Sequence, residues 1–467
     1  MSKNESQILK EVSLFVRAAV RLGCRYLSCG GPASRLEQYI LKAGKAFGYK
    51  TEVFSTPTGV FVSALNPSKT RVVTFVGRVK DVSFNLTELD QMETLLIRLS
   101  KGEIHPSEAI HIVKTSDPDM MPWRQTLKLI GAYLVGFSAT LLNFGELYAS
   151  AIAGLITMLV FVIVGPFTHH FNFNPLFTRF LGGVVGLSLA MLLSTVLSLP
   201  MEALAIGSVI ILIPSLMLTT GISELAEQNY VSGLVKLLQT FVTGLGLFIS
   251  YLLVNDLAQF IDIGHFSLST PGVDVGAVLG PVAPYLIYFT LVLAIAMRFQ
   301  VPRRAMPGVL FTSIVGWILI RELSHPDYLI SLTFLTSLLV GLLSVAFGAL
   351  IKLPSQIFSV PGILSLVPGL FAMSSFQSLM EFNDSSMEVI LKTVLIASSI
   401  VFGLFVARVP FSGNNADFDE VSQSLTDDLV ADDDGEPLLG EECEEITTKD
   451  GDRESLSNNC DYTRGLM

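Results

Sequence analysis

The chain has 467 residues, of which 51% are apolar and only 15% are charged, and its mean hydropathy is +0.58. Several apolar runs reach about 20 residues, which is enough to cross the ~30 Å hydrocarbon layer of a bilayer. This composition, with a net charge of −11, excludes an ordinary soluble or nucleic-acid-binding protein. It indicates a polytopic α-helical membrane protein.

Residues 1–118 have the pattern of a soluble, cytoplasmic α/β domain. The alternation of charge and apolarity from Glu5 to Cys24 predicts an amphipathic helix, and neither a cleavable signal nor a membrane span. GGPASRLEQYILKAGKAFGY predicts a second helix that Pro32 begins and Gly48 ends. Three β-rich runs follow, KTEVFST, GVFVSAL and RVVTFVG, with a turn at Thr-Pro-Thr-Gly, and helical spacing returns in residues 85–100 and 106–114.

Polar residues of this domain permit an enzyme interpretation, in which His105 or His111 is the base and the pocket is formed by Arg35, Glu37, Thr56, Thr58, Arg71 and Arg78. The sequence has no G-x-S-x-G elbow, no Walker A loop and no metal-ligand spacing, including at its four cysteines. We therefore expect no enzyme, no metal site, no cofactor and reduced thiols. A gating, regulatory or oligomerising role is expected instead, and a homo-oligomer is one form of it.

Beyond Trp123, ten apolar spans are predicted, five in residues 119–254 and five in residues 282–409, joined by a connection at 255–281. The spans cover residues 126–143, 147–165, 177–198, 203–220, 232–254, 283–298, 306–320, 329–350, 359–379 and 388–408.

Basic residues near the span ends predict the orientation in a cell (inner) membrane. With both termini cytoplasmic, the cytoplasmic side holds Arg124, Lys128, Arg179, Arg298, Arg303, Arg304, Lys352 and Arg408. The connection at 255–281 has three Asp and no Lys or Arg, which suits the extracytoplasmic side. Arg321 is the one exception.

Residues 410–467 form an acidic tail. From Phe411 onward there are 17 acidic residues against Lys449, Arg453 and Arg464, a net charge of −14. Blocks of like charge without a helical period predict disorder. The tail could bind a partner, regulate transport or be functionally quiet.

An internal repeat relates the two sets of spans. LSLVPGLFAMSSFQSLMEF (364–382) matches ILIPSLMLTTGISELAEQN (211–229), with Pro368 over Pro214, and a lysine-started apolar run follows each copy. Five spans per copy force the two copies to cross the membrane in opposite senses. This is the inverted-repeat plan of many secondary transporters, whose substrate sites lie near midplane at broken helices.

The two prolines predict helix breaks that face one central site, although transmembrane prolines also kink helices without binding anything. Polar residues beside each break suit a small polar substrate: Ser215, Thr219 and Thr220 in the first copy, and Gly369, Ser374, Ser375 and Gln377 in the second. Serine and threonine also bond back to their own helix, which is the simpler interpretation.

Glu224 and Glu227 follow the first break on one helical face, with Lys236 ahead. A carboxylate near hydrocarbon is costly to ionise, so Glu224 could carry a proton across or bind a substrate ammonium. The alternative is that both acids lie in a wet cytoplasmic loop.

The chain resembles the threonine/serine exporter family. The resemblance covers about residues 8–408 and rests on the order of GGPASRLEQYILKAGKAFG, VFSTPTGVFVSAL, TRVVTFV and NLTELDQMETLLIRLSKGEIHPSEAIHIV before the paired LIPS and LVPG spans. It implies a cytoplasmic N-terminal domain, ten spans and export of threonine, serine or, in split relatives, dicarboxylates such as succinate. The first copy reads Pro214-Ser215 where the family commonly has Pro-Gly.

The sequence thus predicts a secondary transporter, a proton-coupled antiporter exporting a threonine- or serine-like amino acid, with membrane lipid around it. The alternatives are a dicarboxylate exporter and, from another class, a channel or a scaffold that recruits partners through the domain and tail.

Overall fold

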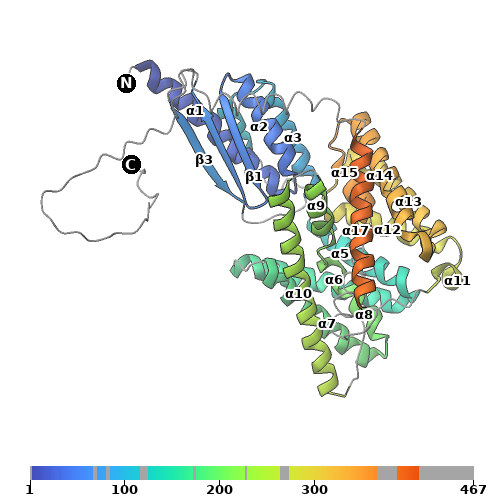
Figure 1. Cartoon of the computed structure of the whole chain (residues 1–467). Helices are drawn as coiled ribbons and strands as arrows, with labels where there is room; N and C mark the ends of the chain where they lie inside the picture. The colour runs from blue at the N-terminus through green and yellow to red at the C-terminus, as the bar shows by residue number, and fades with distance from the viewer. Residues whose placement is uncertain are drawn as a thin grey trace, which may run out of the picture. The chain divides into compact units, whose positions relative to one another are not determined.

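The structure is a computed structural model that describes residues 3–66, 71–79, 85–115, 125–171, 175–226, 229–262, 273–364 and 386–409. The chain, shown in Figure 1, divides into two units, Met1–Asn414 and Asn415–Met467. All described residues belong to the first unit, so the predicted acidic tail lies outside them.

The N-terminal elements follow the predicted order. They are α1 (Lys3–Ser28), α2 (Ala33–Ala46), β1 (Lys50–Thr56), β2 (Gly59–Leu65), β3 (Val72–Arg78), α3 (Leu86–Ser100) and α4 (Pro106–Thr115). The strands form an antiparallel sheet of order β1-β2-β3, and Thr-Pro-Thr-Gly is the hairpin turn that pairs Thr56 with Gly59. Gly48 has a φ of +74°, a conformation that favours glycine at the end of a helical segment.

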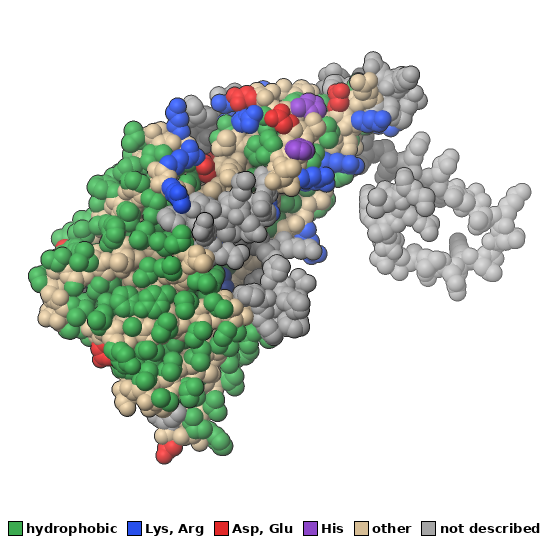
Figure 2. Space-filling model, turned by 180° about the vertical axis from the view of Figure 1, so that it is seen from behind, with side chains coloured by type: hydrophobic (Ala, Val, Ile, Leu, Met, Phe, Trp, Pro, Cys, Tyr) green, Lys and Arg blue, Asp and Glu red, His purple; other side chains and the backbone are tan. Residues whose placement is uncertain are grey.

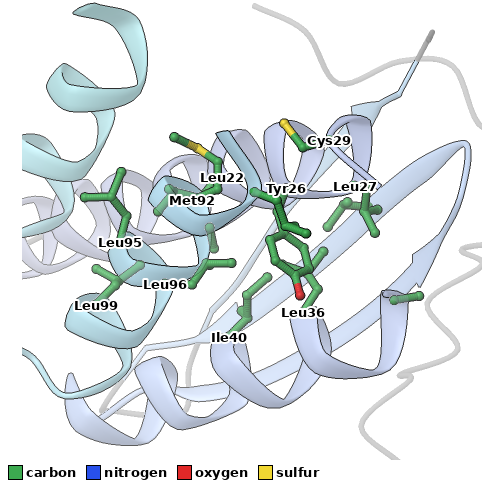
Figure 3. Close-up of a cluster of buried hydrophobic side chains, with 14 of the residues drawn as sticks. Leu22, Tyr26, Leu27, Cys29, Leu36, Ile40, Met92, Leu95, Leu96 and Leu99 are labelled. Carbon is green, nitrogen blue, oxygen red and sulfur yellow. The ribbon is translucent and has the colours of Figure 1, made fainter. Parts of the chain in front are cut away.

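The core of this part lies between the sheet and its helices. Strand alternation points Val60, Val62 and Ala64 towards the helices and leaves Phe61 exposed. Figure 3 shows leucines of α1, α2 and α3 in one buried cluster with Tyr26, which is fully buried. Asn85 begins α3 as its N-cap, since its side chain accepts the Glu88 N–H at 3.2 Å.

The remaining described elements are α-helices with short 3₁₀ turns. They are α5 (Gln125–Phe144), α6 (Leu147–Phe171), α7 (Pro175–Leu197), α8 (Met201–Val209), η1 (Ile210–Leu212), α9 (Ser215–Ala226), α10 (Tyr230–Phe260), α11 (Val275–Leu279), α12 (Ala283–Arg298), η2 (Arg303–Ala305), α13 (Met306–Leu323), η3 (Pro326–Tyr328), α14 (Leu329–Ile351), α15 (Gln356–Leu364) and α17 (Ser386–Arg408).

Seven of the described helical segments are long and apolar enough to cross a membrane, and each coincides with a predicted span. Two predicted spans fall on shorter apolar segments, Met201–Leu212 and Ala283–Arg298, and most of the span predicted at 359–379 lies outside the described residues. Hydrophobic side chains cover a broad surface of the molecule, while most charged ones gather at one end (Figure 2). Such a surface suits hydrocarbon, and the chain is a polytopic membrane protein.

The N-terminal elements pack against the link between α12 and α13. The N–H groups of Leu86 and Thr87 donate to the carbonyls of Phe299 and Gln300 at 2.9 and 3.1 Å. Arg304 Nη2 donates to Asp90 Oδ2 at 2.5 Å. The buried side chains of α1 to α4 continue without interruption into those of α12, α13 and α15. The N-terminal part is therefore attached to the second half of the membrane region.

Gly403 sets the closest approach of α17 to α14. A Cβ there would lie 2.0 Å from Ser337 Oγ and 2.6 Å from the Phe334 carbonyl oxygen. We expect Gly403→Val to separate the helices and destabilise the protein by about 1–3 kcal/mol or more. A thermal unfolding midpoint in detergent measures this. Val406→Leu, on the exposed face of α17, is the control and should leave the midpoint unchanged; equal midpoints for both variants would contradict the packing argument.

Candidate functional site

The helix break predicted at Pro214 is present. Helix α8 ends at Val209, η1 ends at Leu212, Ile213 is extended, and α9 begins at Ser215. Proline disfavours a helical conformation at the residue before it, which accounts for the extended Ile213. Arg179 Nη1 donates to the Leu212 carbonyl at 3.3 Å, so a side chain already satisfies this backbone group at the break.

Glu224 lies in the last turns of α9 and is only 3% exposed. The alternative that it sits in a wet loop is therefore wrong. It forms an ion pair with Lys236 of α10, whose side chain is 15% exposed. The pairing depends on how α9 and α10 pack against each other, because a separation of 12 residues would not bring the two side chains together on one continuous helix.

Two cavities meet at this ion pair, and Thr220, Glu224 and Lys236 line both. The smaller, about 20 Å³, also touches Gly30, Gly31 and Pro57 of the N-terminal part. The larger, about 60 Å³, extends to residues of the second half, including Gln356, Ser359 and Arg408. The smaller volume holds about one water molecule, so the smaller cavity does not enclose an amino acid in this conformation.

Three buried acceptor atoms beside the ion pair have no hydrogen-bond partner in the part of the chain that the structure describes. They are Glu224 Oε2, Ser232 Oγ and Gln356 Oε1. Buried polar groups without partners cost about 1–3 kcal/mol each, so they are uncommon outside functional sites. All three line the two cavities, and together they suit a ligand that donates hydrogen bonds, such as an ammonium group.

Glu37, in the N-terminal part, is a second carboxyl group that feels the charge of Glu224. Its Oε1 accepts the Ser55 N–H at 2.6 Å and the Ser55 hydroxyl at 2.9 Å. Burial raises the pKa of Glu37, the hydrogen bonds from Ser55 oppose that shift, and the negative charge of Glu224 adds to it. Glu37 and Glu224 are thus electrostatically linked across the junction.

The raised pKa of Glu37 gives a pH dependence with a definite sign. A carboxyl group whose pKa is raised by folding binds its proton more tightly in the folded state, so stability falls as pH rises above the ordinary value of 4.5. We expect Glu37→Gln to reduce the fall in the thermal midpoint between about pH 5 and about pH 8. Exposed Glu52 gives the control, Glu52→Gln, which should reproduce the wild-type slope. Parallel slopes in all three proteins would argue against the assignment.

The other polar residues of the N-terminal part do not form one pocket. Arg35 pairs with Glu93 at 3.4 Å, and the hydroxyls of Thr56 and Thr58 lie 3.2 Å apart in the hairpin turn. Arg71 directly precedes β3 and Arg78 ends it, so the two lie about 20 Å apart at the rise of a strand. His105 and His111 are both exposed. The pocket of the enzyme interpretation is therefore wrong.

The predicted substrate residues have mixed outcomes. Thr220 lines both cavities. Ser215 and Thr219 lie on α9, with side chains outside the described part. Five predicted residues also fall outside it: Pro368, Gly369, Ser374, Ser375 and Gln377, together with the acid Glu227.

The length of α9 separates the two groups that were predicted to share one substrate. Ser215 and Glu224 are nine residues apart, which is about 13.5 Å along a helix. The ammonium and carboxylate of one α-amino acid are only a few ångströms apart. One amino acid therefore does not reach both the break at Pro214 and Glu224.

Two family models match the chain. One, described as a putative threonine/serine exporter, matches residues 17–258. The other, described as Threonine/Serine exporter, ThrE, matches residues 285–409. No curated protein and no solved structure matches. The two matches together span both the N-terminal elements and the membrane helices.

Proposed function

The chain belongs to the threonine/serine exporter family, and from this premise we propose that it exports a small polar amino acid of the threonine or serine type in exchange for protons. Membership indicates a transporter of small molecules rather than an enzyme. The observation that carries the proposal is the buried Glu224–Lys236 ion pair at the junction of the two cavities.

The ion pair supplies both charges that an amino acid needs. Glu224 Oε2, Ser232 Oγ and Gln356 Oε1 accept hydrogen bonds from the substrate ammonium, while Lys236 binds its carboxylate. The two charged groups of the site lie in contact, which matches the short separation of the two charges in an amino acid. The proposed substrate site is therefore at the far end of α9 from Pro214.

Proton coupling follows from the same pair. Substrate and proton compete for Glu224: the substrate ammonium binds the ionised carboxylate, and the substrate carboxylate binds Lys236. When substrate leaves, Glu224 takes up a proton in its place, and it releases that proton on the other side before it pairs with Lys236 again. Burial makes each unpaired charge costly, so the two events are linked.

We propose ten spans in two inverted repeats, with both termini cytoplasmic in the inner membrane. The order of helices supports the repeat, because five helices of the first half are followed along the chain by five helices of the second half. The first five are α5, α6, α7, α8 and α10, and the second five are α12, α13, α14, α15 and α17. The contact between Asp90 and Arg304 supports a cytoplasmic N-terminal part, because Arg304 is among the basic residues assigned to the cytoplasmic side. Arg321 pairs with Asp274 at 3.7 Å, which balances the one basic residue on the other side.

The N-terminal part acts as the inner gate of this site. Its turn at Gly30 and Gly31 and its hairpin turn at Pro57 line the smaller cavity opposite α9 and α10. The cavity is too small for a substrate in this conformation, so transport requires these turns to separate from α10.

Dicarboxylate export is the second candidate, because two cations, Lys236 and Arg408, line the larger cavity. Proteoliposomes loaded with labelled threonine, with a pH gradient imposed, test the proposal. Efflux above that of empty vesicles supports it, and inhibition by succinate identifies the second candidate. Flux that does not depend on the pH gradient indicates a channel. If neither threonine nor succinate is transported, the scaffold is the remaining alternative.

A further inference from the structure

Two half-buried arginines lie beside the break at Pro214, and neither pairs with a carboxylate among the residues described. Arg179 donates to the Leu212 carbonyl and its Nη2 lies 4.0 Å from Met217 Sδ. Arg298 lies 5.0 Å from the centre of the Phe161 ring, and its buried Nε has no hydrogen-bond partner in the described ranges. Each guanidinium therefore keeps unused donors.

Packing brings the two arginines to the same 3₁₀ turn. Arg179 bonds to Leu212, the last residue of η1. Ile210, the first residue of η1, packs against the cluster of Val135, Ala294 and Ile295, and the last two lie one helical turn before Arg298. The two positive charges are close enough to repel each other.

Helix α9 adds to this positive charge. It begins at Ser215, directly after the break, and Arg179 touches Met217 in its first turn. The N-terminus of a helix carries a partial positive charge and free N–H groups. Three sources of positive potential thus lie around η1 and the start of α9, and both arginines are half-buried, where an unbalanced charge is costly.

We propose that Arg179, Arg298 and the first turn of α9 bind an oxyanion, a carboxylate or a phosphate. Guanidinium groups hold such anions through charge-assisted, often bidentate hydrogen bonds. The site lies about 13.5 Å along α9 from Glu224, so it is separate from the proposed amino-acid site. The oxyanion comes either from the headgroup of an anionic lipid or from a small solute.

Thermal unfolding of the purified full chain in a neutral detergent distinguishes the two sources. One arm adds phosphatidylglycerol against phosphatidylcholine, and the other adds succinate against an uncharged solute at equal concentration. We expect at least one anion to raise the midpoint, and we expect the shift to be at least halved in Arg179→Gln and in Arg298→Gln. Lys114→Gln removes the same charge from an exposed position and should keep the full shift. A shift with phosphatidylglycerol alone assigns a lipid, and one with succinate alone assigns a solute.

No shift with either anion, or equal shifts in all variants, would overturn the proposal. If a glutamine variant does not fold, Arg179→Lys and Arg298→Lys keep the charge and lose the bidentate fork. The anion concentration for half the shift should then rise about tenfold, and an unchanged concentration in both overturns the site. The measurement needs no transport, so its failure is distinct from failure of the export proposal.

Discussion

Replacing Glu224 with glutamine is expected to abolish the part of threonine efflux that a pH gradient drives. The change removes the only acidic group that lines either cavity in the described structure, and with it the group proposed to carry the proton. A lost hydrogen bond to a charged group is worth about 1.5–3 kcal/mol, so apparent substrate affinity should also fall about 10- to 100-fold. Labelled efflux from proteoliposomes, with and without the gradient, measures both effects.

The controls must separate lost function from lost folding, because Glu224→Gln leaves Lys236 buried without its partner. Breaking a buried ion pair from one side costs about 3–5 kcal/mol, whereas removing both charges is often nearly neutral. The double variant Glu224→Gln/Lys236→Met should therefore regain wild-type thermal stability and still show no gradient-driven efflux. Glu146→Gln, at an exposed position, should transport normally. Gradient-driven efflux by the stable double variant would show that Glu224 does not carry the coupled proton.

Replacing Gly31 with alanine is expected to open the inner gate and raise efflux in the absence of a gradient several-fold. A Cβ at Gly31 would lie 2.3 Å from the ring of Tyr26, and that ring is fully buried and has no room to move. The turn must shift instead, and it lines the smaller cavity above Glu224. Passive efflux from proteoliposomes at equal pH on both sides measures the leak.

A second change tests whether the clash is the cause. Tyr26→Leu makes room at the ring position, so Gly31→Ala/Tyr26→Leu should leak less than Gly31→Ala alone. Tyr26→Leu by itself measures the cost of the lost ring. If Gly31→Ala leaves the passive leak at the wild-type level while the protein folds, the turn does not gate the site.

Local sequence signals predicted most of the N-terminal part. Three of these signals are the alternation in GVFVSAL, the turn residues Thr-Pro-Thr-Gly and the glycine at position 48, which has a positive φ. Each acts within a few residues, so it can be recognised from the sequence alone. The break at Pro214 was equally predictable, because proline removes a backbone donor wherever it stands. Its role in binding stays a prediction.

The partner of Glu224 could not be predicted from local sequence signals. Lys236 was visible as a charge in an apolar run, but its contact depends on the angle between α9 and α10, which no local pattern encodes. Arg179 was assigned only to the membrane orientation, and no sequence pattern singled out Ser232 or Gln356. Gln356 comes from the other half of the chain, so no spacing in the sequence links it to Glu224.

The sequence by itself determined the apolar spans, the helix break and the family resemblance, because each of these depends on residue type and local order. Only the tertiary structure decided which buried charges meet. Burial makes Glu224 depend on Lys236, and it leaves Arg179 and Arg298 together without a carboxylate in the described residues. Long-range packing brings these groups together, and the low dielectric of the protein interior makes their pairing, or its absence, costly enough to matter.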